Sequence, residues 1–139
     1  VVRPFLVYGP GQNMSRFLPQ VISGCLEDLD FPVSKGEQLR DFCFIEDIID
    51  GILLAATKRG ALGEVINLAS GNPTSIRSII QEIVNLIGGG RPQWGKLNYR
   101  IGENMELYAD ITKAKKILKW KPKITIKEGL KETIDFYKK

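Results

Sequence analysis

The 139-residue sequence contains no histidine. This absence excludes the Ser-His-Asp triad, Cys-His pairs and most catalytic zinc sites. Any chemistry on this chain therefore depends on Tyr, Lys, Ser, Asp, Glu or Arg side chains, or on a bound cofactor. We assign no metal site.

Cysteine is scarce, and the two present, Cys25 and Cys43, lie in apolar surroundings without metal-ligand spacing. We expect free thiols in a reduced, cytoplasmic chain rather than a disulfide scaffold. No apolar run approaches the roughly 20 residues of a bilayer span. Lys and Arg number 20 against 16 Asp and Glu, and a net charge of +4 does not by itself indicate nucleic-acid binding. With 43% hydrophobic residues, residues 1–139 can form one folded domain.

Short strand-like segments alternate with helix-like segments along the chain. The predicted strands are a buried strand over residues 1–8, a second over 64–69, and a hairpin of 31–33 and 40–44 around 34–37. The predicted helices span residues 15–26, 45–56, 76–87, 110–118 and 126–137. This alternation is typical of an α/β fold with some parallel strand pairing.

Five segments carry a family resemblance. In order they are Arg3-Pro4-Phe5-Leu6-Val7-Tyr8-Gly9-Pro10-Gly11-Gln12; Phe17-Leu18-Pro19; Leu39-Arg40-Asp41-Phe42 with Ile45-Glu46-Asp47; Val65-Ile66-Asn67-Leu68-Ala69-Ser70-Gly71; and Asp110-Ile111-Thr112-Lys113-Ala114 with Leu118-Lys119-Trp120-Lys121-Pro122. Together they resemble the C-terminal half of the extended short-chain dehydrogenases/reductases, the NAD-dependent epimerases and dehydratases of nucleotide sugars. The resemblance covers nearly the whole chain.

The resemblance implies the substrate-binding portion of a Rossmann-type enzyme whose N-terminal dinucleotide-binding half is absent from these residues. Residues 1–12 would then be the end of the Rossmann-side sheet, and residues 13–139 the nucleotide-sugar-binding part. It implies NAD as the cofactor, a nucleotide-diphosphate sugar as the substrate and a homodimeric parent enzyme. No nucleic-acid or membrane partner is expected.

Arginines are the first candidates for holding a diphosphate, because their guanidinium forks pair with phosphate oxygens. Arg40 lies among apolar neighbours and needs an anion, which is a ligand or, alternatively, Asp41 or a nearby carboxylate. Arg100 and Glu103 match the family's Arg-x-Gly-Asp/Glu element, in which the arginine reaches the diphosphate and the acid lies near the ribose. The alternative is an exposed ion pair on a solvated loop.

The resemblance also implies residues around the base and at the cofactor. Arg16 and Phe17 match the base-facing start of a helix, and Phe31 and Val33 match the strand that covers the base. Core packing explains the three apolar side chains equally well. Asn67 reaches the ligand or satisfies backbone groups at a strand end. The segment Tyr8-Gly9-Pro10 would line the nicotinamide end of NAD, or simply end a strand.

Two departures from the family bear on the reaction subtype. Leu6 stands where many members have a phosphate-binding Asn, and residues 104–106 lack the arginine that many 4,6-dehydratases carry. Together with the Arg100–Glu103 spacing, these departures favour a 4-epimerase resembling UDP-glucose 4-epimerase. A 4,6-dehydratase or a uronate decarboxylase remains the alternative within the family.

The catalytic elements of the family are missing from these residues. No tyrosine is followed four residues later by lysine, and residues 88–90 read as a helix stop rather than a Gly-rich pyrophosphate loop. We therefore assign no catalytic residue and expect the isolated chain to be inactive. Two other classes remain open: a non-catalytic nucleotide-binding module, and a nucleic-acid-binding domain built on the lysines of residues 113–123.

Overall fold

The computed structural model describes all residues, 1–139. Its helices are α1 (Phe17–Leu26), α2 (Ile45–Thr57), α3 (Ile76–Ile87) and α4 (Ile126–Tyr137), with a 3-10 turn η1 (Arg59–Ala61) and a π-helical turn η2 (Ala114–Leu118). Its strands are β1 (Val2–Pro4), β2 (Leu6–Tyr8), β3 (Asp30–Pro32), β4 (Leu39–Arg40), β5 (Phe42–Phe44), β6 (Ile66–Leu68), β7 (Thr74–Ser75), β8 (Arg91–Gln93) and β9 (Glu106–Leu107). The α/β alternation is confirmed.

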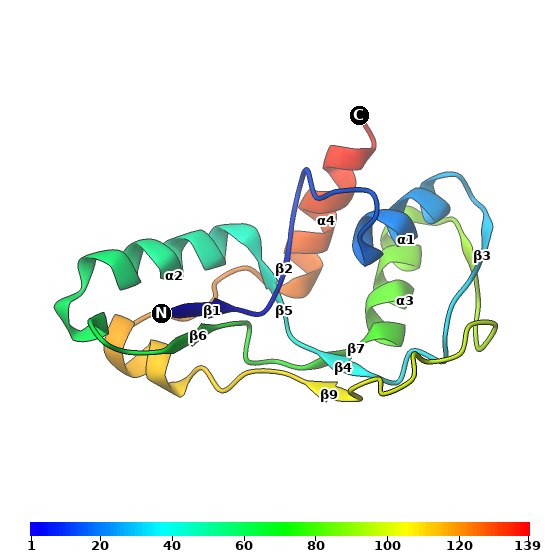
Figure 1. Cartoon of the computed structure of the whole chain (residues 1–139). Coiled ribbons are helices and arrows are strands. Elements are labelled where there is room, and N and C mark those ends of the chain that lie inside the picture. Colours follow the sequence, from blue (N-terminus) through cyan, green and yellow to red (C-terminus); the bar gives the residue numbers. More distant parts are fainter.

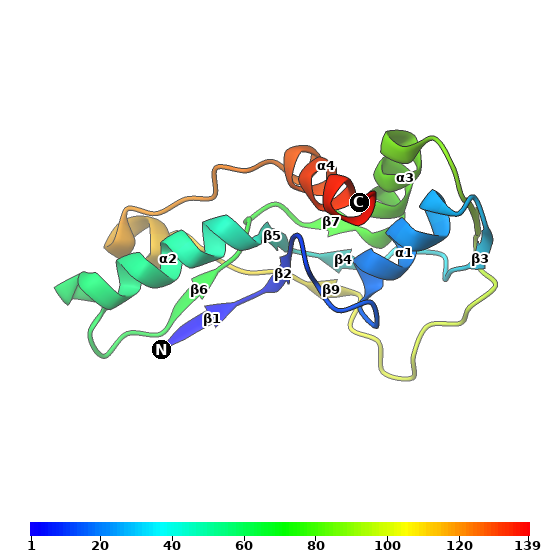
Figure 2. The same cartoon turned by 90° about the horizontal axis from the view of Figure 1, so that it is seen from above.

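The molecule is elongated, with α2 over β1 and β6 at one end and α1 and α3 at the other (Figure 1). Helix α4 stands between the two ends, as Figure 2 also shows from above. Two hydrophobic clusters follow this division. The larger joins α1, α3, α4 and β5, and the smaller joins α2 with β6 and η2. None of the helices combines the length and the apolar composition that a membrane span requires.

Helices with strong local signals lie where the sequence predicts them. The apolar stripe of α3 is buried through Ile79, Ile80 and Ile83. The Ser75 hydroxyl accepts a hydrogen bond from the Ser78 backbone N–H at the start of α3, as an N-cap should. Gly88 ends the helix in the left-handed conformation, with φ of 78°.

The predicted hairpin of residues 31–33 and 40–44 is wrong. Strand β3 pairs in parallel with β8, whereas β4 lies between β7 and β9. The predicted buried strand 1–8 is also corrected, because it divides into β1, which pairs with β6, and β2, which pairs with β5. Most of its side chains are exposed or half-buried. Both errors concern pairing partners distant in sequence, which local patterns do not encode.

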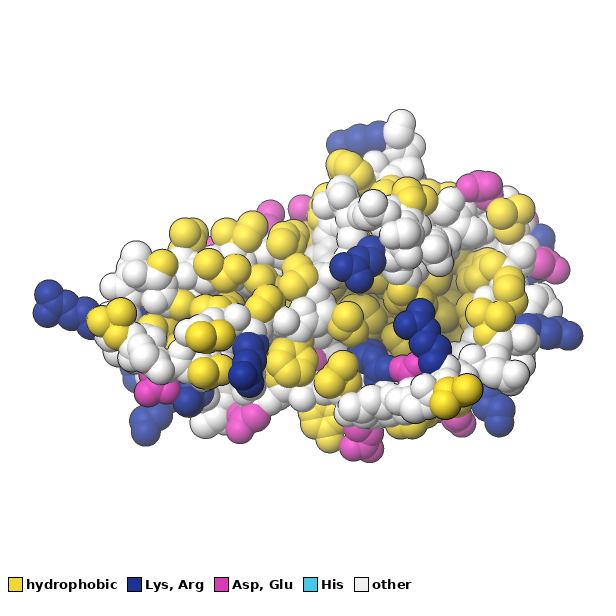
Figure 3. All heavy atoms as spheres, viewed as in Figure 1, with side chains coloured by type: hydrophobic (Ala, Val, Ile, Leu, Met, Phe, Trp, Pro, Cys, Tyr) yellow, Lys and Arg dark blue, Asp and Glu magenta, His cyan; other side chains and the backbone are white.

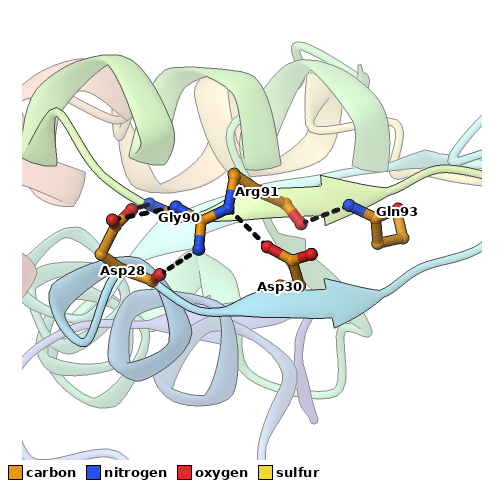
Figure 4. Close-up of polar contacts among 5 residues, drawn as sticks. All are labelled: Asp28, Asp30, Gly90, Arg91 and Gln93. Carbon is orange, nitrogen blue, oxygen red and sulfur yellow. Dashed lines mark hydrogen bonds and ion pairs between the residues drawn. The ribbon is translucent and has the colours of Figure 1, made fainter.

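An exposed network of ion pairs joins β8 to β3 and to Asp28, two residues before β3 (Figure 4). Arg91 lies between Asp28 and Asp30, and it donates to the Asp28 carboxylate at 2.9 Å and to the Asp28 carbonyl at 2.7 Å. The Arg91–Asp30 pair completes the fork. The Arg91 guanidinium therefore pairs with oxygen atoms of the chain itself. Strand β3, which these contacts join to β8, is followed directly by Val33.

Candidate functional site

A cavity of about 1170 Å³ opens beside α1 on the half of the molecule that holds the larger hydrophobic cluster. Figure 3 shows this hollow with hydrophobic side chains inside and Lys or Arg side chains around it. The candidate residues that border it are Tyr8, Gly9, Pro10, Arg16, Phe17, Val33, Arg40, Arg100 and Glu103. Segments far apart in the sequence, from residues 4–20 to residues 97–107, thus meet at one hollow.

Part of the cavity wall is apolar because it is the exposed side of the larger hydrophobic cluster. Phe17 at the start of α1 packs against Phe42 of β5, with ring centroids 6.4 Å apart. Ile76 and Ile80 of α3 also border the cavity. Phe17 and Val33 therefore belong to the core and to the cavity wall at once, so the two interpretations of the sequence are compatible.

Arg40 lies in β4 with its side chain only 12% exposed, and it forms an ion pair through Nη2 with Glu103, which is 19% exposed. Its Nη1 donates to the Leu39 carbonyl oxygen at 2.8 Å. The intramolecular carboxylate that the sequence left open is therefore Glu103 rather than Asp41. The pair lies within the cavity, where a ligand anion would compete for the same guanidinium.

Asp41 is fully buried and points away from Arg40 into the protein. Its Oδ1 accepts hydrogen bonds from the Ser70 backbone N–H at 2.7 Å and the Ser70 hydroxyl at 2.6 Å. Its Oδ2 accepts from the backbone N–H groups of Gly71 at 3.1 Å and Ala109 at 3.3 Å. Asp41 thereby ties β4 to two distant loops and holds its neighbour Arg40 in place.

Arg100 and Glu103 belong to one tight turn. The Glu103 N–H donates to the Arg100 carbonyl oxygen at 3.0 Å, and Gly102 has φ of 75°, a conformation that favours glycine. The turn places the arginine and the glutamate on the same rim of the cavity. The Arg100 side chain is exposed and has no ion-pair partner.

Arg16 immediately precedes α1 and is also exposed without an ion-pair partner. Three guanidinium groups, those of Arg16, Arg40 and Arg100, therefore border a cavity to which Glu103 contributes the one acidic side chain. This excess of positive charge beside apolar walls suits an anionic ligand with an apolar or aromatic part.

Two candidate residues lie away from the cavity. Phe31 packs against Gly24 of α1, as a core side chain. Asn67 donates from Nδ2 to the Asp110 carbonyl oxygen at 3.3 Å, which is the backbone-satisfying role left open by the sequence. Of the basic residues 113–123, Lys113 and Lys123 pair with acids on neighbouring elements and belong to a solvated surface.

The structure adds residues that sequence reasoning missed. The Tyr99 hydroxyl accepts from the Glu37 N–H at 3.1 Å and donates to Glu37 Oε2 at 3.0 Å, which joins two segments of the cavity rim. Gln12 and Gln38 also border the cavity, and each has a buried amide oxygen without a hydrogen-bond partner. The sequence could have indicated Gln38, because it lies two residues before Arg40 and alternate residues of a strand lie on the same face.

Tyr8 ends β2 with its side chain turned toward α4. Its hydroxyl donates to the Ile126 carbonyl oxygen at 3.4 Å, and burial raises the pKa of the phenol well above its ordinary value. It therefore stays protonated at neutral pH and borders the cavity without serving as a base. Gly9 and Pro10 continue the rim.

The glycine run of residues 88–90 does not form a dinucleotide-binding loop. The glycines of residues 88–90 end α3, and Gly90 packs so closely on Cys25 that a Cβ there would meet Sγ at 2.7 Å. They form no pyrophosphate cradle. Tyr8, Gly9 and Pro10 border the cavity, away from these glycines.

Comparisons with known proteins agree with this geometry. Residues 1–69 match the model of the NAD dependent epimerase/dehydratase family. The UDP-glucuronate 4-epimerase of Thermodesulfobacterium geofontis is 39% identical over 99% of the chain and 42% of its own length.

Solved structures give the same result. The UDP-glucuronic acid 4-epimerase of Bacillus cereus, in complex with UDP-glucuronic acid and NAD, superposes with a TM-score of 0.89 at 32% identity, over 99% of this chain and 44% of that one. The UDP-glucose 4-epimerase of Thermotoga maritima, with UDP-glucose, gives 0.89 at 27% identity, over 99% and 45%. The chain thus spans less than half the length of the relatives it matches.

The similarity nevertheless extends over 99% of this chain. It therefore includes the strands and helices that position the cavity. The chain belongs to the NAD-dependent epimerase/dehydratase family, and its fold is that of the C-terminal portion of these enzymes.

Proposed function

We propose that this chain is the nucleotide-sugar-binding portion of an NAD-dependent 4-epimerase acting on a UDP-sugar. One observation carries the proposal: Arg40 and Arg100, 60 positions apart in the sequence, border a common cavity that also has an apolar wall. A nucleoside diphosphate combines the two features that this cavity accommodates, an anionic bridge and a flat base.

In this proposal the guanidinium groups of Arg40 and Arg100 hold the diphosphate, and Arg16 adds positive charge at the rim. Phe17 and Val33 form the wall against the base. The Glu103 carboxylate accepts hydrogen bonds from ribose hydroxyls. Binding energy gained at these remote groups fixes the sugar in position for the reaction. Phe31 supports this wall from the core, and Asn67 contributes only to the scaffold.

The family is NAD-dependent, and bound NAD supplies hydride acceptance and return at the sugar. We place the nicotinamide end beside Tyr8-Gly9-Pro10. Residues 1–12 are assigned to the edge of the dinucleotide-binding sheet, and residues 13–139 to the nucleotide-sugar part. Because the sequence contains no Tyr-x-x-x-Lys, the acid–base group for C4 is assigned to none of these residues.

The remaining assignments follow the same proposal. Leu6 stands where many family members have a phosphate-binding Asn, and residues 104–106 lack the arginine expected of many 4,6-dehydratases. Both departures favour epimerisation over dehydration or decarboxylation. The two buried, unpaired cysteines suit a reducing, cytoplasmic location. We propose a homodimer as the assembly of the whole enzyme.

Calorimetric titration with UDP tests the binding role directly. We expect Arg40→Ala to weaken UDP binding by about 2–3 kcal/mol, because a charge-assisted fork in a largely buried position is lost. Arg59→Ala is the matched control, since Arg59 is exposed on η1 outside the cavity. Unchanged affinity in the Arg40 variant would mean that Arg40 only pairs with Glu103.

The reaction subtype is tested on the enzyme that contains this chain, supplied with NAD and UDP-glucose or UDP-glucuronate. A 4-epimer as the product supports the proposal. A 4-keto-6-deoxy sugar or released carbon dioxide would instead identify a dehydratase or a decarboxylase.

A further inference from the structure

The last turn of α4 holds the loop that follows β2, and the two lie side by side in Figure 1. The Tyr137 hydroxyl donates a hydrogen bond to the Gln12 carbonyl oxygen, 125 positions earlier in the sequence. The Phe136 ring stands edge-on to Tyr137, with centroids 5.2 Å apart, and a Cβ on Gly11 would lie 3.9 Å from Phe136 Cζ. Two adjacent aromatic residues of α4 therefore contact two adjacent residues of the loop.

The loop itself, residues 9–12, makes few other contacts. It forms no helix or strand and no backbone–backbone hydrogen bond. Its start is fixed, because Gly9 packs so closely on Ile45 that a Cβ would meet Cγ2 at 2.5 Å. At its end, the Gln12 side chain donates from Nε2 to the Val7 carbonyl oxygen at 3.1 Å and closes a turn. The bond from Tyr137 is then what fixes the backbone at the end of this turn.

Helix α4 is a firm support for that bond. A Cβ on Gly129 would lie 2.2 Å from the Tyr8 hydroxyl oxygen, so only a glycine lets the helix approach β2 this closely. The same hydroxyl donates to the Ile126 carbonyl oxygen at 3.4 Å. Leu130 and Ile134 are buried in the larger hydrophobic cluster. The helix is thus bound to the last residue of β2, directly before the loop begins.

Residues 9–12 border the cavity, whereas Phe136 and Tyr137 do not. The proposed function places the nicotinamide end of NAD beside Gly9 and Pro10. The sugar has to lie against the nicotinamide for hydride to pass between them, so the loop borders the place where the two meet. The base and the diphosphate are assigned to side chains of other segments. A shift of this loop therefore alters the alignment of the sugar and leaves the nucleotide contacts in place.

We propose that Tyr137 is a positioning residue, which aligns the sugar with the nicotinamide by holding the Gln12 carbonyl oxygen. This inference rests on the proposed function and extends it to a residue outside the cavity. Without the hydroxyl, the carbonyl oxygen loses its partner and the turn shifts. Because group transfer depends on alignment at the scale of an ångström, the loss acts on kcat. UDP lacks the sugar that reacts, so its binding stays the same.

The test uses Tyr137→Phe in the enzyme that contains this chain, with NAD, with UDP-glucose or UDP-glucuronate as the substrate, and with UDP as a competitive inhibitor. Phenylalanine keeps the ring and its packing on Phe136 and removes only the hydroxyl. We expect kcat to fall about fivefold to tenfold, as the loss of one hydrogen bond allows. The inhibition constant of UDP should not change.

Tyr108→Phe is the matched control, because the Tyr108 hydroxyl donates to Glu106 Oε2 at 3.4 Å and the residue does not border the cavity. It should leave kcat and UDP inhibition unchanged. An unchanged kcat in Tyr137→Phe, or UDP inhibition that weakens in step with kcat, would refute the positioning role and leave the proposed function standing. If the unmodified enzyme neither epimerises a UDP-sugar nor is inhibited by UDP, both are overturned.

Discussion

Replacing Asp41 with asparagine is the sharpest test of what holds the site together. The Asp41 carboxylate is fully buried and accepts four hydrogen bonds, two on each oxygen. Asparagine keeps one carbonyl oxygen, which can retain the two bonds from Ser70. Its amide nitrogen then faces the N–H groups of Gly71 and Ala109, and donors placed against donors form no bond.

The magnitude follows from these two lost contacts. A hydrogen bond to a charged group contributes about 1.5–3 kcal/mol, so the two together contribute roughly 3–6 kcal/mol. At 3.1 and 3.3 Å the bonds from Gly71 and Ala109 are longer than the usual 2.9–3.0 Å, which favours the lower end, about 3 kcal/mol. Domains of this kind have a free energy of unfolding of about 5–15 kcal/mol, so the loss is large.

Urea unfolding followed by tryptophan fluorescence measures this change. Trp120 is buried in the smaller cluster, and Trp94 lies under the Arg77 guanidinium and packs against the larger cluster, so the two report on different ends of the molecule. Asp135→Asn is the control, because its exposed carboxylate makes only a 3.7 Å contact with Lys138. A loss below about 1 kcal/mol in Asp41→Asn would refute the hydrogen-bond argument.

Three further predictions concern other parts of the molecule. Hydrogen bonds from the Thr125 hydroxyl and N–H lower the pKa of Glu128; its stabilisation is thus complete above the unfolded pKa of about 4.3 and lost as pH falls through the folded value. Glu128→Gln should flatten this acid limb in urea titrations, and an unaltered limb would contradict us. Burial raises the pKa of Cys25 to about 11 and of Cys43 to about 12; Ellman's reagent at pH 8 should therefore modify them only after unfolding, and rapid modification of the native chain would be contrary evidence. Leu53 is 59% exposed on an apolar face of α2; we expect concentration-dependent self-association that Leu53→Lys reduces in sedimentation equilibrium, and a constant monomer mass for the unmodified chain would count against this.

Helix prediction succeeded where the stabilising signal is local. In α3 the capping serine, the isoleucine stripe and the terminal glycine all lie within 14 consecutive residues, from Ser75 to Gly88. In α4, Thr125 and Glu128 form a capping box within four residues. Such signals act between near neighbours, so the sequence reveals them directly.

The candidate site was only partly accessible in this way. Residue chemistry identified Arg40 as needing an anion, and the family resemblance added Arg100 and Glu103. Neither approach indicated that Arg40 pairs with Glu103 or that Asp41 bonds to Ser70, Gly71 and Ala109. These partners lie 29 to 68 positions away along the chain, where periodicity and capping carry no information.

The sequence by itself determined the four α-helices, the α/β class and the absence of histidine-based chemistry, because each follows from residue identity or short-range spacing. The helix predicted over residues 110–118 is shorter in the structure, where η2 covers Ala114–Leu118. Only the tertiary structure decided that residues 1–8 divide between two pairing partners, that β3 pairs with β8, and that three arginines and one glutamate share a cavity. The physical reason is that backbone hydrogen bonds between strands can form with many partners. Packing of the whole chain around its hydrophobic clusters selects among these partners.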